Sequence, residues 1–359
     1  MRRLVLTLVV LSACQRQASS PSRLPEVGPG LRAAIGDVDG DRRGEIAIAD
    51  AGELRLLDRA GRQLAAMPAP GGIQALAIAD LDGDGRGEIA AGWGRDRDHG
   101  EATARVSLLH LESGALREEV VAAPESERPQ IAAIVPAPPD LFIAWYDSQY
   151  TVKSAFARRA GDGKSWRLDE VAVIRTAGSY ALGDVDGDGQ RDLVVGRFYG
   201  DEQASDGDAF LLRPGGARVA VPTTRGVHAI ALADFDGDGQ SELLLADGWH
   251  KDYGHQARAH LTWDRWRDGA FESDGIVEIP GDYTIWALLA ADLDGDRRPE
   301  LVARGSGSVW VYSVDRDGGW NGKKVAGEAA DIATGEIDGA PGDELLVVAP
   351  GGSQWIARK

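Results

Sequence analysis

Short apolar runs recur along the chain and are separated by turns rich in Gly, Asp and Pro. Runs such as 193–195 (Leu-Val-Val) and 243–245 (Leu-Leu-Leu) are too short for helices and are apolar on both faces. Such runs are typical of buried β-strands. Each repeat offers four of them, and in the first repeat they cover 33–36, 46–49, 54–57 and 63–67.

A nine-residue acidic loop, Asp-x-Asp-Gly-Asp-x-x-x-Asp/Glu, lies between the first two runs of most repeats. Complete copies begin at Asp37, Asp80, Asp184, Asp234 and Asp292. A sixth copy, at 336–344, keeps Glu336, Asp338 and Glu344 but has Ala340 and Pro341 inside the loop.

The closing acids of these loops give the number of repeats. They lie at positions 45, 88, 192, 242, 300 and 344, at intervals of 43, 104, 50, 58 and 44 residues. The long interval has room for another copy near position 140. There the apolar runs 131–134 and 141–144 remain, and Pro136, Pro138 and Pro139 replace the acidic loop. We therefore count seven repeats.

Four-stranded repeats of this length stack radially into a β-propeller, so we expect an all-β fold with seven blades in residues 23–359. The last repeat stops after 354–357 without a fourth run. Segment 23–27 precedes the first loop at the offset of a fourth strand. It is expected to complete the last blade.

The loops have the composition of a calcium site. Calcium prefers six to eight oxygen ligands, which carboxylates at alternate positions of a curled loop supply. Gly at the fourth position permits the required turn. An EF-hand would need Glu at position 12, where this chain has Ile48, Ala91, Val195, Leu245 and Ala303. The expected ligands of about five calcium ions are Asp37, Asp39, Asp41, Glu45, Asp80, Asp82, Asp84, Glu88, Asp184, Asp186, Asp188, Asp192, Asp234, Asp236, Asp238, Glu242, Asp292, Asp294, Asp296 and Glu300.

The alternative for any one loop is a plain solvated turn, but five copies with one spacing and one strand context favour metal binding. The eroded copy at 336–344 is expected to bind calcium weakly or not at all.

The segments 34–41 and 181–189 resemble the FG-GAP/VCBS repeats of integrin-α-like propellers. The resemblance extends over nearly all of 23–359. It implies a calcium loop between the first and second strands of a blade, on one rim, with ligands on the opposite face. The repeat near position 140 departs from this pattern.

The N-terminus resembles a bacterial lipoprotein signal. Arg2 and Arg3 precede an apolar run at 4–11, which is too short to span a bilayer, and Leu-Ser-Ala-Cys ends at Cys14. Residues 1–13 are the expected signal peptide, Cys14 the lipidated residue and 14–22 a flexible tether. An ordinary signal peptide is the alternative. The expected location is the bacterial cell envelope, either periplasmic or surface-facing.

Charge restricts the partners. The chain has 359 residues and a formal net charge of −18, and the five complete loops hold 20 of its 57 acids. A nucleic-acid partner is therefore not expected. Cys14 is the only cysteine, so the chain contains no internal disulfide.

Aromatic and polar residues mark the face opposite the loops as the candidate ligand surface. They come from the connections between second and third strands and from positions six residues before each loop. These candidates are Gln74, Trp93, Trp145, Tyr146, Arg197, Tyr199, His228, Trp249, His250 and Trp286. Flat rings beside hydrogen-bonding groups suit both sugars and protein partners. The alternative is that individual rings pack between blades.

Three functions remain open. The first is a non-catalytic module that binds a glycan or a protein, which we favour because nucleophile, metal-triad and phosphate-loop motifs are missing from the sequence. The second is a calcium-dependent polysaccharide lyase, which some propellers of this kind resemble. The third is a structural subunit of an envelope complex. No catalytic residue is assigned.

Overall fold

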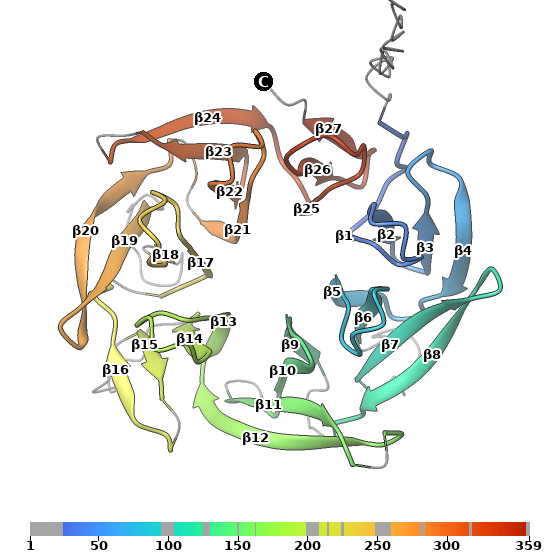
Figure 1. Cartoon of the computed structure of the whole chain (residues 1–359), viewed down its shortest axis with the longest axis horizontal. Coiled ribbons are helices and arrows are strands. Elements are labelled where there is room, and N and C mark those ends of the chain that lie inside the picture. Colours follow the sequence, from blue (N-terminus) through green and yellow to red (C-terminus); the bar gives the residue numbers. More distant parts are fainter. Residues whose placement is uncertain are drawn as a thin grey trace, which may run out of the picture.

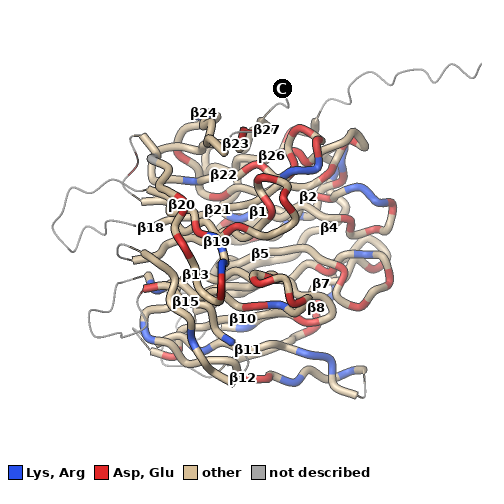
Figure 2. The backbone as a smooth tube through the Cα atoms, turned by 60° about the vertical axis from the view of Figure 1, so that its left-hand side comes forward, with Lys and Arg blue, Asp and Glu red and all other residues tan. Residues whose placement is uncertain are grey.

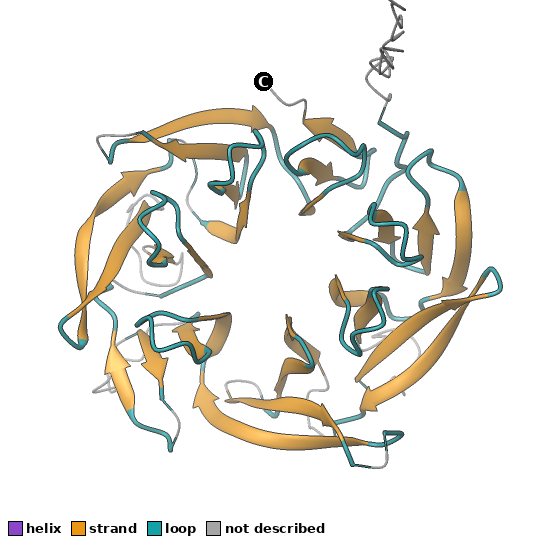
Figure 3. Cartoon of the chain, viewed as in Figure 1, coloured by secondary structure: helices purple, strands orange, loops and turns teal. Residues whose placement is uncertain are grey.

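The computed structural model describes residues 24–94, 104–124, 130–148, 151–161, 163–198, 208–213, 215–223, 226–247, 260–280, 282, 284–315 and 318–356. Its strands form seven antiparallel sheets arranged as a ring (Figure 1). Figure 3 shows that strands and connecting loops account for the described part of the chain. The all-β, seven-bladed prediction is confirmed.

Each sheet is one blade, and its strands follow one another in the order of the sequence. The first three blades consist of β1 (Arg32–Gly36), β2 (Glu45–Ala49), β3 (Glu53–Leu57) and β4 (Gln63–Pro68); β5 (Ile73–Ala79), β6 (Glu88–Trp93), β7 (Arg105–Glu112) and β8 (Ala115–Ala122); and β9 (Gln130–Ala137), β10 (Asp140–Tyr146), β11 (Thr151–Arg159) and β12 (Trp166–Arg175).

Blades 4 to 7 continue the ring. They consist of β13 (Ala177–Gly183), β14 (Asp192–Arg197), β15 (Ala209–Leu212) and β16 (Arg218–Ala220); β17 (Ala229–Ala233), β18 (Glu242–Asp247), β19 (His260–Arg267) and β20 (Ala270–Glu278); β21 (Ile285–Ala291), β22 (Glu300–Gly305), β23 (Val309–Val314) and β24 (Trp320–Ala326); and β25 (Asp331–Gly335), β26 (Glu344–Val348) and β27 (Gln354–Ile356).

The second strand of each blade is buried on both faces, as its uninterrupted apolar sequence requires. In blade 1, Ile46 pairs with Ile35 of β1 on one side and with Leu57 of β3 on the other. Ile46 and Ile48 are fully buried. The cores lie between neighbouring blades: one cluster joins Ala33 and Ile48 of blade 1 to Ala333 and Leu346 of blade 7. The ring therefore closes through side-chain packing.

The last blade differs from the expectation in one respect. Its sheet has three strands, and segment 24–30 lies beside it without joining the ladder. The contacts come mainly from side chains: Trp355 Nε1 donates to the Pro25 carbonyl at 2.8 Å, and Ser353 Oγ donates to the Gly28 carbonyl at 2.8 Å. Pro25 and Pro29 remove two backbone donors from this segment, which weakens a ladder. Segment 24–30 thus covers blade 7 without becoming its fourth strand.

Among the described residues, no helix is long and apolar enough to cross a membrane. The expected signal peptide, Cys14 and the tether lie outside the described residues.

Candidate metal loops and the opposite end of the ring

The acidic loops join the first and second strands of their blades. We number them by blade: loop 1 (37–45), loop 2 (80–88), loop 4 (184–192), loop 5 (234–242), loop 6 (292–300) and the eroded loop 7 (336–344). In loop 1 the first aspartate organises the turn, because its Oδ1 accepts the backbone N–H of Gly40 at 2.6 Å and of Asp41 at 3.1 Å. Loops 4 and 5 repeat both hydrogen bonds.

Two positions of each complete loop need a left-handed backbone. The fourth is always Gly, as in Gly40, whose φ is 85°. The sixth was missed by sequence reasoning. It is Gly in loops 2, 4 and 5, but Arg42 and Arg297 hold it at φ 68° and 74° in loops 1 and 6. A non-glycine residue there carries a cost of about 1 kcal/mol, so the loop fold is maintained against local strain.

The closing acid of each loop is buried and tied to the backbone. Glu45 Oε2 accepts the N–H of Val38 at 2.8 Å, and the same hydrogen bond to the second loop residue is present in all six loops. Burial raises the pKa of Glu45, Glu242 and Glu300 to about 7, against the opposing effect of these backbone hydrogen bonds. Burial also raises the pKa of Glu88 and Asp192. Ionised carboxylates at these sites therefore favour a nearby cation.

The geometry of the clusters fits a divalent cation. In each of the five complete loops, at least three carboxylates offer oxygens that lie within 4.8 Å of one another. Two oxygens bound to the same calcium ion at about 2.4 Å are separated by no more than about 4.8 Å. Oε1 of Glu242 is buried and accepts no hydrogen bond. These residues could hold a metal ion, and an all-oxygen donor set is the one that calcium prefers.

Neighbouring loops are hydrogen-bonded to one another along this rim. The carbonyl of Asp37 accepts the N–H of Gly87 in loop 2 at 2.5 Å, and the carbonyl of Glu336 accepts the N–H of Gly44 in loop 1 at 2.7 Å. The carbonyl of Asp292 accepts the N–H of Asp343 at 2.6 Å. Loops 6, 7, 1 and 2 therefore form one connected series, which includes loop 7 although Ala340 replaces its third acid.

Blade 3 lacks an acidic loop, as expected, and retains only the closing acid. Asp140 accepts a hydrogen bond from Arg158 Nε at 2.9 Å.

Trp286 marks the opposite end of the ring. Trp286 lies near the start of β21, and loop 6 follows the end of this strand. Trp286 and loop 6 are therefore separated by about 20 Å, the length of the strand at 3.3 Å per residue. The Trp286 side chain is 42% exposed. Its ring stacks at 6.1 Å and 23° on Phe198 of blade 4 and lies edge-on at 5.6 Å to His228 of blade 5. Residues from three blades thus build one partly exposed aromatic cluster.

Charged residues continue this end of the ring. Asp331 starts β25, and its Oδ2 accepts the N–H of Ala33 at 3.2 Å. Burial raises the pKa of Asp331, while the guanidinium groups of Arg32 and Arg304 oppose the shift. Arg32 Nε donates to the Gln74 carbonyl at 2.9 Å. Two guanidinium groups with one carboxylate leave this group of residues positive within an acidic protein.

The acidic repeat identifies the family to which part of this sequence is similar. Residues 184–245 match the family model described as FG-GAP-like repeat. This chain carries an FG-GAP-like repeat. The matched segment begins at loop 4 and ends in β18, just after loop 5, so it contains two of the complete acidic loops. A comparison with curated proteins found no match.

Solved structures share the fold of this chain. Bacillus licheniformis rhamnogalacturonan lyase PL11 is similar with a TM-score of 0.55 and 11% identity, over 92% of this chain and 72% of the other. A protein from Lactobacillus plantarum gives a TM-score of 0.50 and 15% identity, over 92% of this chain and all of the other. At these identities the likeness shows the fold alone.

The structure separates the remaining candidate ligand residues by how far they are buried. Trp93 and Trp145 are 1% and 5% exposed, so both are core residues rather than part of an open face. Trp93 Nε1 donates to Ser107 Oγ at 3.2 Å. Arg197 is also buried, with its guanidinium 5.1 Å from the Phe210 ring. Exposure therefore distinguishes Trp286 from these residues.

Gln74 and Tyr146 are partly buried. Gln74 Oε1 accepts the N–H of Ile131 in the next blade at 2.7 Å, which makes it an inter-blade contact. Tyr199, Trp249 and His250 lie outside the described residues.

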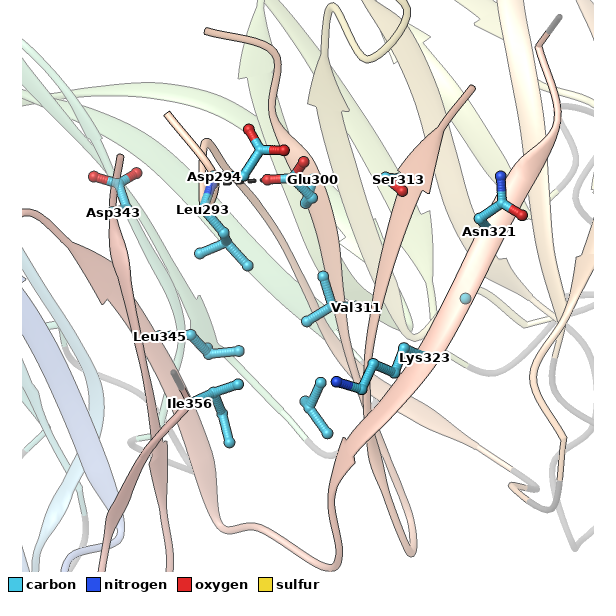
Figure 4. Close-up of a pocket in the computed structure, with 12 residues that line it drawn as sticks. Leu293, Asp294, Glu300, Val311, Ser313, Asn321, Lys323, Asp343, Leu345 and Ile356 are labelled. Carbon is cyan, nitrogen blue, oxygen red and sulfur yellow. Dashed lines mark hydrogen bonds between the residues drawn. The ribbon is translucent and has the colours of Figure 1, made fainter. Parts of the chain in front are cut away.

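A pocket of about 310 Å³ lies between blades 6 and 7, beside loop 6. Figure 4 shows Asp294 and Glu300 at one end, Ser313 and Asn321 on the blade 6 side, and Leu345 and Ile356 on the blade 7 side. It adjoins the acidic loops, not the aromatic cluster.

Proposed function

We propose that the chain is a calcium-stabilised, non-catalytic propeller that binds a glycan or protein partner at the end of the ring opposite its acidic loops. The observation that carries this proposal is the cluster of Trp286, Phe198 and His228. A large ring that remains 42% exposed while its neighbours hold it in place supplies binding area with little loss of side-chain entropy.

We assign calcium a structural role because the five complete loops have the composition of calcium sites. Their oxygens fit one cation each, and loops 1, 2 and 6 take part in the rim contacts that join the blades. The nearby guanidinium groups of Arg32 and Arg304 favour a partner that offers an anionic group. We also propose that residues 1–13 are a lipoprotein signal and that Cys14 carries a lipid. This lipid anchor would place the binding face in the bacterial cell envelope.

Trp286→Ala tests the binding surface. We expect at least about a 30-fold loss of affinity for the partner, since buried interface tryptophans are frequent hot spots. Partners are first found by glycan-array binding and by co-purification from envelope extracts. Ile276→Ala is the matched control, because Ile276 is an exposed apolar residue on the outer strand β20. Equal affinity of wild type and Trp286→Ala for every partner found would refute the proposed surface.

A polysaccharide lyase is the second candidate, favoured by one observation: the likeness in fold to rhamnogalacturonan lyase PL11. Lyase chemistry leaves an unsaturated sugar that absorbs in the ultraviolet. Product formation from pectins or alginates, with loss of that product in Trp286→Ala, would replace binding by catalysis as the function. A stable envelope complex that covers the Trp286 cluster would instead favour the structural-subunit reading.

A further inference from the structure

In blades 1 to 6, one position in the third strand or directly after it lies opposite the closing acid of the second strand. The ladders fix this register: Leu243 pairs with Asp264, which brings Glu242 next to Arg265, and Leu193 pairs with Leu212, which brings Asp192 next to Arg213. Residues directly opposite in an antiparallel pair project from the same face. The side chain at this position therefore points at the carboxylates of the loop.

In blades 4 and 5 this side chain is an arginine that enters the acidic cluster. Arg213 Nη1 lies 2.7 Å from Asp186 and 3.1 Å from Asp192. Arg265 pairs with Asp236 and lies 3.1 Å from Asp238 and 3.6 Å from Glu242. Both guanidinium groups thus contact oxygens that would otherwise face only a metal ion.

Blade 3 shows the same position without a metal loop. Leu141 pairs with Ala157, which places Arg158 opposite Asp140, and the two side chains are 2.9 Å apart. Here a guanidinium alone compensates the closing acid.

Blades 1 and 6 have no positive charge at this position. It is Asp58 in blade 1, whose carboxylate pairs with Arg62 at 2.7 Å. In blade 6 it is Ser313, and the space beside it is the 310 Å³ pocket that Asp294 and Glu300 line (Figure 4). Blade 2 is intermediate, since His110 Nδ1 lies 3.7 Å from Glu88.

We propose that the residue opposite the closing acid sets how strongly each blade depends on calcium. Arg213 and Arg265 are built-in counter-ions that lower the calcium affinity of loops 4 and 5 and preserve those blades when calcium is scarce. Loops 1 and 6 have no counter-ion at the third-strand position, and in loop 6 only Arg298 of the loop itself pairs with Asp296, at 3.0 Å. They therefore bind calcium more tightly and lose more stability without it. The inference rests on the proposal that the acidic loops bind calcium.

Arg265→Gln tests the inference through calcium titration and thermal unfolding of the full chain. Removing the guanidinium should tighten one calcium site by about tenfold, because a like charge a few ångströms away opposes the cation. The melting temperature in EDTA should fall, and the melting temperature in saturating calcium should change much less. Arg167→Gln is the matched control, since Arg167 pairs with Asp169 at 2.7 Å in blade 3, which has no acidic loop. It should leave the calcium titration unchanged.

Ser313→Arg is the reverse test, and the adjacent pocket has room for the new side chain. It should weaken one high-affinity calcium site and raise the melting temperature in EDTA. The inference is overturned if Arg265→Gln leaves calcium affinity unchanged, or lowers the melting temperature equally with calcium and with EDTA. A wild-type chain that binds no calcium would overturn the calcium assignment and the inference together. Calcium binding by wild type with no effect of either variant would overturn the inference alone.

Discussion

At the scale of single residues, the closing acid of a loop both anchors the loop backbone and is a buried carboxylate. Glu45 anchors loop 1 through the N–H of Val38, while burial raises its pKa to about 7. The sequence predicts this residue as a ligand from its spacing. Its burial could not be predicted from spacing alone, because it depends on β2 being enclosed by neighbouring strands and blades.

The raised pKa values predict opposite effects of pH with and without calcium. In EDTA the folded protein takes up protons on Glu45, Glu242 and Glu300 below about pH 7, whereas the unfolded chain does so only near 4.5. This contribution to stability is full below pH 4.5 and is lost as pH rises through 7. The melting temperature in EDTA should therefore increase from pH 8 to pH 6.

In excess calcium the order should reverse, because protons compete with the ion for the same carboxylates. Melting curves at both pH values, with and without calcium, measure the two slopes. Slopes of the same sign would show that these acids are not metal ligands.

At the scale of elements, loops 6, 7, 1 and 2 act as linked parts of one rim. Gly87 and Gly44 each donate to the carbonyl of the first residue of the preceding loop in the ring. The sequence shows these glycines as part of a motif, but the close approach between blades appears only in the structure. A Cβ on Gly87 would lie 2.9 Å from the Asp37 carbonyl oxygen and 2.7 Å from Cγ2 of Ile78.

Gly87→Ala should consequently destabilise the protein by about 2 kcal/mol through overpacking between loops 1 and 2. Denaturant unfolding with calcium present measures the loss. Gly52→Ala is the control, since a Cβ there meets nothing within 4 Å. If the two variants lose the same free energy, the rim contact does not hold the blades together.

At the scale of the whole molecule, the sequence was sufficient for the blade count and insufficient for the binding face. Closing acids spaced by about one repeat, with the apolar runs at 131–134 and 141–144 marking the copy that lost its acidic loop, predicted seven sheets, and the structure contains seven. The position of the binding face depends on which aromatic rings the blades enclose and which they leave exposed. Trp93, at the end of a second strand, and Trp286, near the start of a first strand, were both candidates from the sequence, yet one is buried and the other exposed.

Ring closure was also predicted only in part. The offset of segment 23–27 placed it beside blade 7, where residues 24–30 indeed contact β27 and the loop before it. The prediction of a fourth strand was wrong because register within a repeat does not determine whether a proline-containing segment forms a ladder. Charge is also distributed over the whole molecule: Figure 2 shows Lys and Arg interspersed among Asp and Glu over the described part of the chain.

The most direct test of the account is thermal unfolding of the chain in saturating calcium and again in EDTA. A ligand that binds only the folded state adds about 2.7 kcal/mol per site at one hundred times its dissociation constant. Even partial occupancy of five loops should then raise the melting temperature by about 10 °C or more. A fall of that size on chelation, reversed when calcium is restored, is the predicted result. The same melting temperature in both conditions would contradict the assignment of the acidic loops as calcium sites.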